Sequence, residues 1–184
     1  MITVRVGILG DRGVGKTTLV RRFIGSNILC SRSINVAMKT LHFWIQGRSI
    51  KLNILVCDFR CDKLFTFIIQ RTIRTLNSII IMYDISRRNT FSSVANWINF
   101  VLRSVGRIPM VLVGNKVDLR GYAYDCVSFE EGKRYAEILR EEYYLPIIFL
   151  ETSAQTGYNV EKVFLAAAYL GIRARMLRRR MRLI

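Results

Sequence analysis

The sequence predicts an α/β fold in which a six-stranded, mostly parallel sheet is flanked by about five helices. Strand-like and helix-like segments alternate along the 184 residues, a pattern that places helices on both faces of a sheet. Residues 78–83 and 109–114 are continuous apolar runs, as expected for parallel strands that are buried on both faces. A chain of this length can bury one core, so we expect a single folded domain.

The expected strands lie at six places along the chain: 3–9, 36–45, 49–57, 78–83, 109–114 and 146–150. Between the second and third, Gln46-Gly47-Arg48 is a short glycine-containing turn, so these two strands are expected to form a hairpin. The expected helices cover 16–24, 90–103, 128–142 and the chain from 159 onward. Ser128 and Glu131 have the spacing of a capping box, which marks the start of the third helix.

The composition is that of an ordered protein with a large excess of positive charge. Hydrophobic residues make up 51% of the chain, which argues against disorder. Lys and Arg total 29 against 13 acidic residues, for a formal net charge of +16. Such an excess attracts polyanions, either nucleic acid or an anionic membrane surface, unless it serves only to solubilise the protein.

The targeting and cysteine patterns favour a cytoplasmic location. No apolar run reaches the roughly 18 residues that span a bilayer, and the chain opens into a strand-like segment instead of a signal peptide. Cys30, Cys57, Cys61 and Cys126 lack metal-ligand spacing and are expected to be reduced thiols. Peripheral attachment to the cytosolic face of a membrane is compatible with this pattern.

The run GDRGVGKT at residues 10–17 joins the first strand to the first helix and has the pattern of a phosphate-binding loop. Its glycines let successive backbone N–H groups turn toward an anion, where the helix dipole also points. Lys16 supplies a charge for the β and γ phosphates, and the Thr17 hydroxyl supplies a ligand for Mg²⁺. The alternative is a glycine-rich turn that binds nothing. The expected nucleotide contacts are Asp11, Arg12, Gly13, Val14, Gly15, Lys16, Thr17 and Thr18.

Two further motifs follow strands of the predicted sheet, at the ends where open α/β sheets bind ligands. Asn115-Lys116-Val117-Asp118 comes after the strand at 109–114, and Glu151-Thr152-Ser153-Ala154 comes after the strand at 146–150. The phosphate loop, N-K-x-D and E-T-S-A in this order resemble the Ras-type small GTPases, and Rab proteins most of all, from Val4 to about Ile172. The resemblance implies a P-loop NTPase (small G-protein) fold that binds GTP or GDP with Mg²⁺.

The resemblance also implies roles for the residues of the two base-binding motifs. Asp118 would accept hydrogen bonds from the N1–H and 2-amino group of guanine, and such charge-assisted bonds contribute about 1.5–3 kcal/mol. Asn115 would brace the loop, while the stem of Lys116 would cover the ring. Ser153 and Ala154 belong to the same side of the site, and the Ala154 N–H would donate to the guanine oxygen.

The motif for hydrolysis departs from the family pattern. Asp58 lies 26 residues before Asp84 (84 − 58), the separation expected for the aspartate of D-x-x-G, which holds Mg²⁺ through water. Cys61 then replaces the glycine and keeps only its backbone N–H for the γ-phosphate, while Asp62 replaces the glutamine that orients water. Arg12 would crowd the water and any activating arginine; that Arg12 itself acts as an arginine finger is the less favoured alternative. We expect slow or absent GTP hydrolysis.

The segment before the second strand is altered as well. Ser33 is the favoured counterpart of the family's Mg²⁺-binding threonine; the gap-free alternative, Asn35, is a poorer ligand for a hard cation. The expected metal ligands are therefore Thr17, Ser33 and Asp58. Residues 24–35 contain no aromatic side chain to stack on guanine, and Ile28 stands near that position. Stacking is worth about 1–3 kcal/mol per base, so nucleotide is expected to exchange faster.

The segment 173–184 is expected to form an arginine-rich tail or an extension of the last helix, after a GTP-binding domain over 1–172. Apolar residues at spacings of 4, 3, 4 and 3 line one helical face: Leu170, Ala174, Leu177, Met181 and Ile184. A basic amphipathic helix favours a membrane surface or a calmodulin-like partner, whereas a solvated arginine face is the alternative. No cysteine follows Cys126, so we expect no C-terminal prenylation and only weak, salt-sensitive attachment.

Three functions are compatible with these patterns. The first is a Rab-like switch in traffic or signalling that hydrolyses GTP slowly, and the second is a GTP-binding scaffold held in one state. The third is a polyanion- or membrane-binding protein that nucleotide regulates. The positions that Rab effectors commonly contact hold Met38, Cys57 and Thr72, so the resemblance transfers no effector or exchange factor. We expect a monomer.

Overall fold

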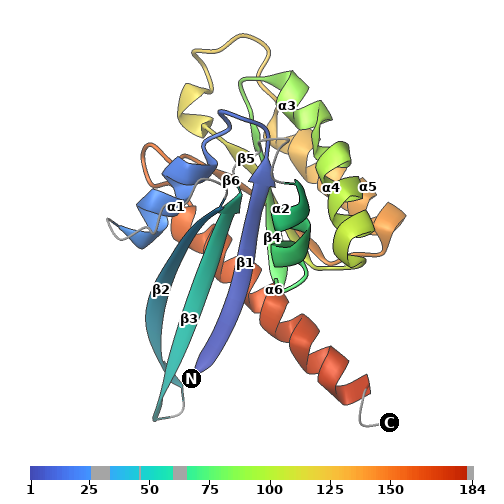
Figure 1. Ribbon diagram of the computed structural model, residues 1–184. Coiled ribbons are helices and arrows are strands. Elements are labelled where there is room, and N and C mark those ends of the chain that lie inside the picture. The colour runs from blue at the N-terminus through green and yellow to red at the C-terminus, as the bar shows by residue number, and fades with distance from the viewer. Residues whose placement is uncertain (26–33, 46, 60–65, 182–184) are drawn as a thin grey trace.

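A computed structural model describes residues 1–25, 34–45, 47–59 and 66–181, and it contains the expected six-stranded sheet (Figure 1). The strand ends differ from the predicted ones by at most two residues. All neighbouring strands are parallel except the β2–β3 hairpin, in which Ile45 pairs with Arg48. The spatial order is β2-β3-β1-β4-β5-β6. The strands are β1 (Ile2–Gly10), β2 (Ile34–Ile45), β3 (Arg48–Phe59), β4 (Ser78–Asp84), β5 (Met110–Asn115) and β6 (Ile147–Thr152).

Among the described residues, five helices have eight or more residues: α1 (Lys16–Ile24), α2 (Thr66–Ile73), α4 (Val94–Val105), α5 (Phe129–Tyr143) and α6 (Val160–Met181). The predicted helix 90–103 is divided into the short α3 (Arg88–Ser92) and α4. The sequence did not predict α2, because its β-branched residues favour strands locally. The capping box before α5 is confirmed: the Glu131 N–H donates to Ser128 Oγ at 3.1 Å, and the Ser128 N–H donates to Glu131 Oε2 at 2.8 Å.

Both faces of the sheet are covered, which explains the continuous apolar strands. Helices α1 and α6 cover one face, where the rings of Phe23 and Phe164 stack 4.0 Å apart. Helices α2, α4 and α5 contribute to the core on the other face. Every residue of β4 and β5 is buried, as predicted for central parallel strands.

The topology brings five strand ends to one edge of the sheet. Strand β1 lies between β3 and β4, so the loop after β1 sits where the chain connections diverge to the two sides. The ends of β3, β4, β5 and β6 adjoin it, because these strands run parallel to β1. In the described part of the chain, no helix is both long and apolar enough to cross a bilayer.

Candidate functional site

The phosphate loop follows β1 and has the backbone conformation that its glycines allow. Gly13 and Gly15 have φ values of 81° and 100°, in the left-handed region where a side chain is strained. A Cβ on Gly15 would also lie 2.4 Å from Asn115 Nδ2, so only glycine fits here. Helix α1 begins immediately afterwards at Lys16, so its N-terminal N–H groups and dipole would favour an anion bound in the loop.

Lys16 is already folded into the loop. Its side chain is buried, with the residue only 8% exposed, and Nζ donates to the carbonyl oxygens of Gly10 at 2.7 Å and Asp11 at 2.8 Å. An ammonium group has three donors, so one N–H remains for a phosphate oxygen. The lysine is therefore held ready for an anion.

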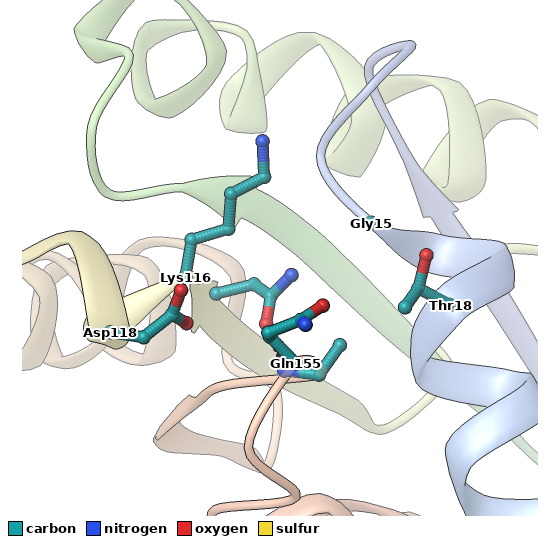
Figure 2. Close-up of a pocket in the computed structure, with 7 residues that line it drawn as sticks. Gly15, Thr18, Lys116, Asp118 and Gln155 are labelled. Carbon is teal, nitrogen blue, oxygen red and sulfur yellow. Dashed lines mark hydrogen bonds between the residues drawn. The ribbon is translucent and has the colours of Figure 1, made fainter.

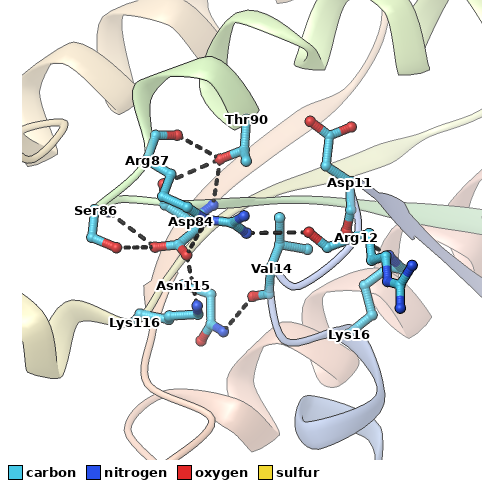
Figure 3. A network of polar contacts seen from close by, with 10 residues as sticks. All are labelled: Asp11, Arg12, Val14, Lys16, Asp84, Ser86, Arg87, Thr90, Asn115 and Lys116. Atoms are coloured by element: carbon cyan, nitrogen blue, oxygen red, sulfur yellow. Dashed lines mark hydrogen bonds and ion pairs between the residues drawn. The ribbon is translucent and has the colours of Figure 1, made fainter.

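Three residues from other elements hold the loop from outside. Asn115 Nδ2, at the end of β5, donates to the Val14 carbonyl at 2.8 Å. After β4, Arg87 donates through a terminal guanidinium nitrogen to the Arg12 carbonyl at 3.2 Å (Figure 3). The third contact comes from α4, where Trp97 Nε1 donates to Asp11 Oδ1 at 2.8 Å.

A cavity of about 260 Å³ opens beside the loop. Figure 2 shows Lys116 and Asp118 on one side of this cavity, with Thr18 and Gly15 of α1 and its loop on the other. The Ser153 hydroxyl donates to Asp118 Oδ1, so the serine orients the carboxylate. The lining consists of Gly15, Thr18, Asn115, Lys116, Asp118, Ala154 and Gln155. The two predicted motifs thus share one cavity.

Asn115 joins the two motifs and the loop. It is 1% exposed, and its Oδ1 accepts the Thr152 hydroxyl and the Ala154 N–H, each at 3.0 Å. This bracing agrees with the role expected for Asn115. The Ala154 N–H is used internally in this structure, so its contact with a guanine oxygen stays a prediction.

Asp84 is a buried acidic group that the sequence did not single out as part of the site. It is 0% exposed and ends β4, where its Oδ2 lies 2.7 Å from Lys116 Nζ and 2.9 Å from Arg87 Nε. The Ser86 hydroxyl and N–H donate to its other oxygen at 2.7 and 3.0 Å. Burial raises the pKa of Asp84, but the hydrogen bonds from Lys116, Ser86 and Arg87 outweigh burial and hold the pKa below its usual value.

A second buried carboxylate, Asp58, lies on the other side of the loop at the end of β3. Asp58 Oδ2 accepts the Thr17 hydroxyl at 2.7 Å and Asn35 Nδ2 at 3.1 Å. Asn35 reaches it because the β2–β3 register pairs these two residues. Asn35 Oδ1 is buried and has no hydrogen-bond partner among the described residues. Ser33, Cys61 and Asp62, which the sequence assigned to the metal and hydrolysis sites, lie outside the described residues.

These oxygen groups fit Mg²⁺. A hydroxyl and a carboxylate are hard oxygen ligands for Mg²⁺, together with water and phosphate, and the unpaired amide oxygen of Asn35 is a further, weaker oxygen donor. No cluster of three or more His, Cys, Asp or Glu occurs in the ranges described above, so a cage made only of protein side chains is not formed there. Mg²⁺ seldom uses one, because it keeps several waters and takes substrate phosphates as ligands.

Sequence reasoning missed four residues that the structure brings to the site: Asp84, Arg87, Trp97 and Gln155. Two had a signal in the sequence, since Asp84 ends a buried strand and Gln155 directly follows the E-T-S-A motif. Arg87 and Trp97 contact the loop across 75 and 86 residues of sequence, so no local pattern marks them.

Comparison with known proteins gives a match to a family profile and matches to many curated relatives. The profile of the Ras family matches residues 5–170, a range that contains the loop and both base motifs. The chain is also 36% identical over 164 residues to the Ras-related protein RIC1 of Oryza sativa subsp. japonica. That alignment covers 88% of this chain and 76% of the plant protein.

Proposed function

The chain belongs to the Ras family of small GTPases, and on that premise we propose that it binds GTP and GDP with Mg²⁺ as a nucleotide-dependent switch. The observation that carries the proposal is the shared cavity, in which Asp118 and Lys116 face Thr18 and Gly15. Residues about a hundred positions apart thus line one cavity, in which Asp118 and Lys116 would contact the base and the loop would contact the phosphates. The Ser153 hydroxyl uses one lone pair of Asp118 Oδ1, so both carboxylate oxygens can still accept a hydrogen bond from guanine.

We propose that Thr17 and Asp58 hold the Mg²⁺ ion. When bound, the ion would neutralise charge on the β and γ phosphates. Asn35 is the described residue that could add a third group, because its unpaired Oδ1 lies beside Asp58. Ser33, the counterpart favoured by the sequence pattern, stays the competing prediction. If Asn35 is the third group, Asn35→Ala should lower the affinity for Mg²⁺ more than Ser33→Ala does. A titration of Mg²⁺ into protein with bound fluorescent GDP measures this.

We propose that hydrolysis is slow. The Arg12 side chain is exposed on the loop, where it would compete with a water or an activating arginine for the γ-phosphate. Asp62 carries a charge that γ-phosphate repels and lacks the amide of glutamine. If hydrolysis is absent altogether, the protein would act as a scaffold that binds GTP and stays in one state.

One set of measurements tests the proposal. The nucleotide bound to the purified protein is identified, and single-turnover hydrolysis of GTP is followed. Asp118→Asn should lower GDP affinity about tenfold or more, because a charge-assisted hydrogen bond becomes a neutral one. Asp125→Asn removes the same charge from an exposed position outside the cavity lining and serves as the control. Unchanged affinity in Asp118→Asn refutes the base site, and hydrolysis at a rate ordinary for the family refutes the slow-switch proposal.

The partner surface is proposed to differ from that of other Rab-like proteins. Of the three positions expected to contact effectors, Met38 is 55% exposed, whereas Cys57 is buried at 4% and cannot be reached from solvent. Thr72, on α2, is half-buried. A role in membrane traffic or signalling therefore rests on the family resemblance, and its effectors would need a different contact set.

A second candidate function, attachment to an anionic membrane surface from the cytoplasm, is favoured by the end of α6. The helix continues past residue 172 and projects beyond the sheet (Figure 1). Met176 and Leu177 are 59% and 51% exposed there, beside exposed Arg173 and Arg178. Of the predicted apolar face, Leu170 is buried in the core, and Ile184 lies outside the described residues.

Vesicle co-sedimentation tests this attachment. Reversing two charges with Arg173→Glu and Arg178→Glu should abolish binding to anionic vesicles, and salt should weaken it. Lys133→Glu with Arg134→Glu, on exposed positions of α5, makes the same charge change elsewhere and should bind better than the α6 variant. Equal binding by both variants refutes a role for α6. Binding to RNA but not to vesicles supports the nucleic-acid alternative instead.

A further inference from the structure

We propose that Arg87 is a positioning residue that clamps the phosphate loop and slows nucleotide release, an inference that rests on the proposed nucleotide site. Arg87 lies in the turn between β4 and α3, outside every motif identified from the sequence. Its Nε donates to Asp84 Oδ2 at 2.9 Å, and a terminal nitrogen donates to the Arg12 carbonyl at 3.2 Å. One side chain thus joins the end of a central strand to the middle of the loop.

The strand end of this clamp is rigid. Asp84 is completely buried and also accepts hydrogen bonds from both donors of Ser86, so its carboxylate cannot turn without losing them. The guanidinium is planar and its donors point in fixed directions. With Nε bound to Asp84, a terminal nitrogen is directed at the Arg12 carbonyl, and Figure 3 shows this arrangement.

The loop end of the clamp sets the orientation of one peptide group. In a trans peptide the C=O and the following N–H point in opposite directions. Because the Arg12 carbonyl points to Arg87, the Gly13 N–H points away from Arg87, and in Figure 3 Lys16 lies on that opposite side of the loop. The guanidinium also lies against the loop backbone, since a Cβ on Gly13 would be 3.3 Å from a terminal nitrogen of Arg87. Arg87 therefore stabilises the anion-binding conformation before nucleotide arrives.

The same carboxylate links the clamp to the base side of the cavity. Asp84 Oδ2 contacts both Arg87 and Lys116, and Lys116 lines the cavity next to Asp118. Asp84 at the end of β4 thus holds both the loop, through Arg87, and the base side of the cavity, through Lys116. This contact opposes movement of the loop away from the phosphates. We infer that the release rate of nucleotide, more than its association rate, depends on Arg87.

The first experiment measures release of fluorescent GDP by stopped flow in the full chain. Arg87→Ala should release it about threefold to tenfold faster, because a half-exposed charged hydrogen bond contributes modestly. Arg88→Ala is a matched control: the side chain is adjacent, 41% exposed against 40% for Arg87, and ion-paired with Asp125 and Glu131 instead of the loop. The release rate of Arg88→Ala should stay within about twofold of the rate of the unchanged protein.

A further variant separates geometry from charge. Arg87→Lys keeps the positive charge but cannot direct donors to Asp84 and the Arg12 carbonyl in a fixed fork. The clamp predicts that Arg87→Lys resembles Arg87→Ala. If Arg87→Lys behaves like the unchanged protein, or if Arg87→Ala and Arg88→Ala have equal rates, the proposal is wrong.

The second experiment needs no nucleotide. Amide hydrogen exchange of the loop should be faster in Arg87→Ala than in Arg88→Ala, whereas exchange of β5 should be the same in both. Unchanged loop exchange contradicts the clamp. If the unchanged protein binds no guanine nucleotide, the proposed function fails, and the exchange experiment still decides whether Arg87 holds the loop.

Discussion

Replacing Asn115 by alanine should destabilise the protein even when no nucleotide is bound. The side chain is 1% exposed and makes three hydrogen bonds, to the Val14 carbonyl, the Thr152 hydroxyl and the Ala154 N–H. Each contributes about 0.5–1.5 kcal/mol, and the truncation leaves buried partners unsatisfied. We expect a loss of about 2–4 kcal/mol, a large part of the 5–15 kcal/mol that is typical of a folded domain.

Urea unfolding of nucleotide-free protein, followed by circular dichroism, measures this loss. Thr152→Val removes one of the three hydrogen bonds and should cost about 1 kcal/mol. Asp118→Ala should change stability less than Asn115→Ala, although both should bind GDP more weakly. A loss below about 1 kcal/mol in Asn115→Ala, or an equal loss in Asp118→Ala, refutes the view that Asn115 is chiefly a brace.

The remaining predictions concern packing, acid stability and hydrolysis. Gly132→Ala should destabilise by about 1–3 kcal/mol in the same assay despite better helix propensity, because a Cβ would lie 2.4 Å from Phe149 and 2.5 Å from Tyr83 Oη. The hydrogen bond from Arg88 lowers the pKa of Glu131 from 4.5 to about 2, so its stabilisation is present above about pH 4.5 and lost as the pH falls toward 2. Glu131→Gln should therefore show a shallower loss of stability in that range, and an unchanged acid profile would contradict this. Arg12→Gly alone should raise the single-turnover rate of GTP hydrolysis only slightly, because Asp62 remains. A rate ordinary for the family in this variant would show that Asp62 does not limit hydrolysis.

Local sequence patterns predicted the strands and the start of α5 because the information there is local. The Ser128–Glu131 spacing forms its capping box at normal hydrogen-bond distances. Helix α2 was missed because its β-branched sequence favours a strand, whereas in the structure it is a helix packed beside α4. Pattern reasoning therefore succeeds where local preference and tertiary packing agree.

In the site as well, the features set by local sequence were predicted, and those set by contacts between distant residues were not. The loop and both base motifs were predicted because each occupies one strand end. The contact of Asn35 with Asp58 depends on the β2–β3 register, which no local pattern marks. The ambiguity between Ser33 and Asn35 arose because Ser33 matches the family's threonine only if the preceding loop is shorter than usual. Arg87 reaches the loop through space alone.

The phosphate end of the cavity is held in place by contacts from outside the loop. Asn115, Arg87 and Trp97 each hold a different residue of the loop, from three separate elements. A loop that is already ordered loses little conformational freedom on binding, so its contacts count more fully toward affinity. On the base side, the sequence offers Ile28 where the family stacks an aromatic ring, which removes about 1–3 kcal/mol. Affinity should therefore depend strongly on the number of phosphates, with GMP bound far more weakly than GDP. Trp97→Phe removes the hydrogen bond to Asp11 and keeps an aromatic ring in the core. It should weaken the binding of GDP more than the binding of GMP, so the difference in affinity between the two nucleotides should become smaller.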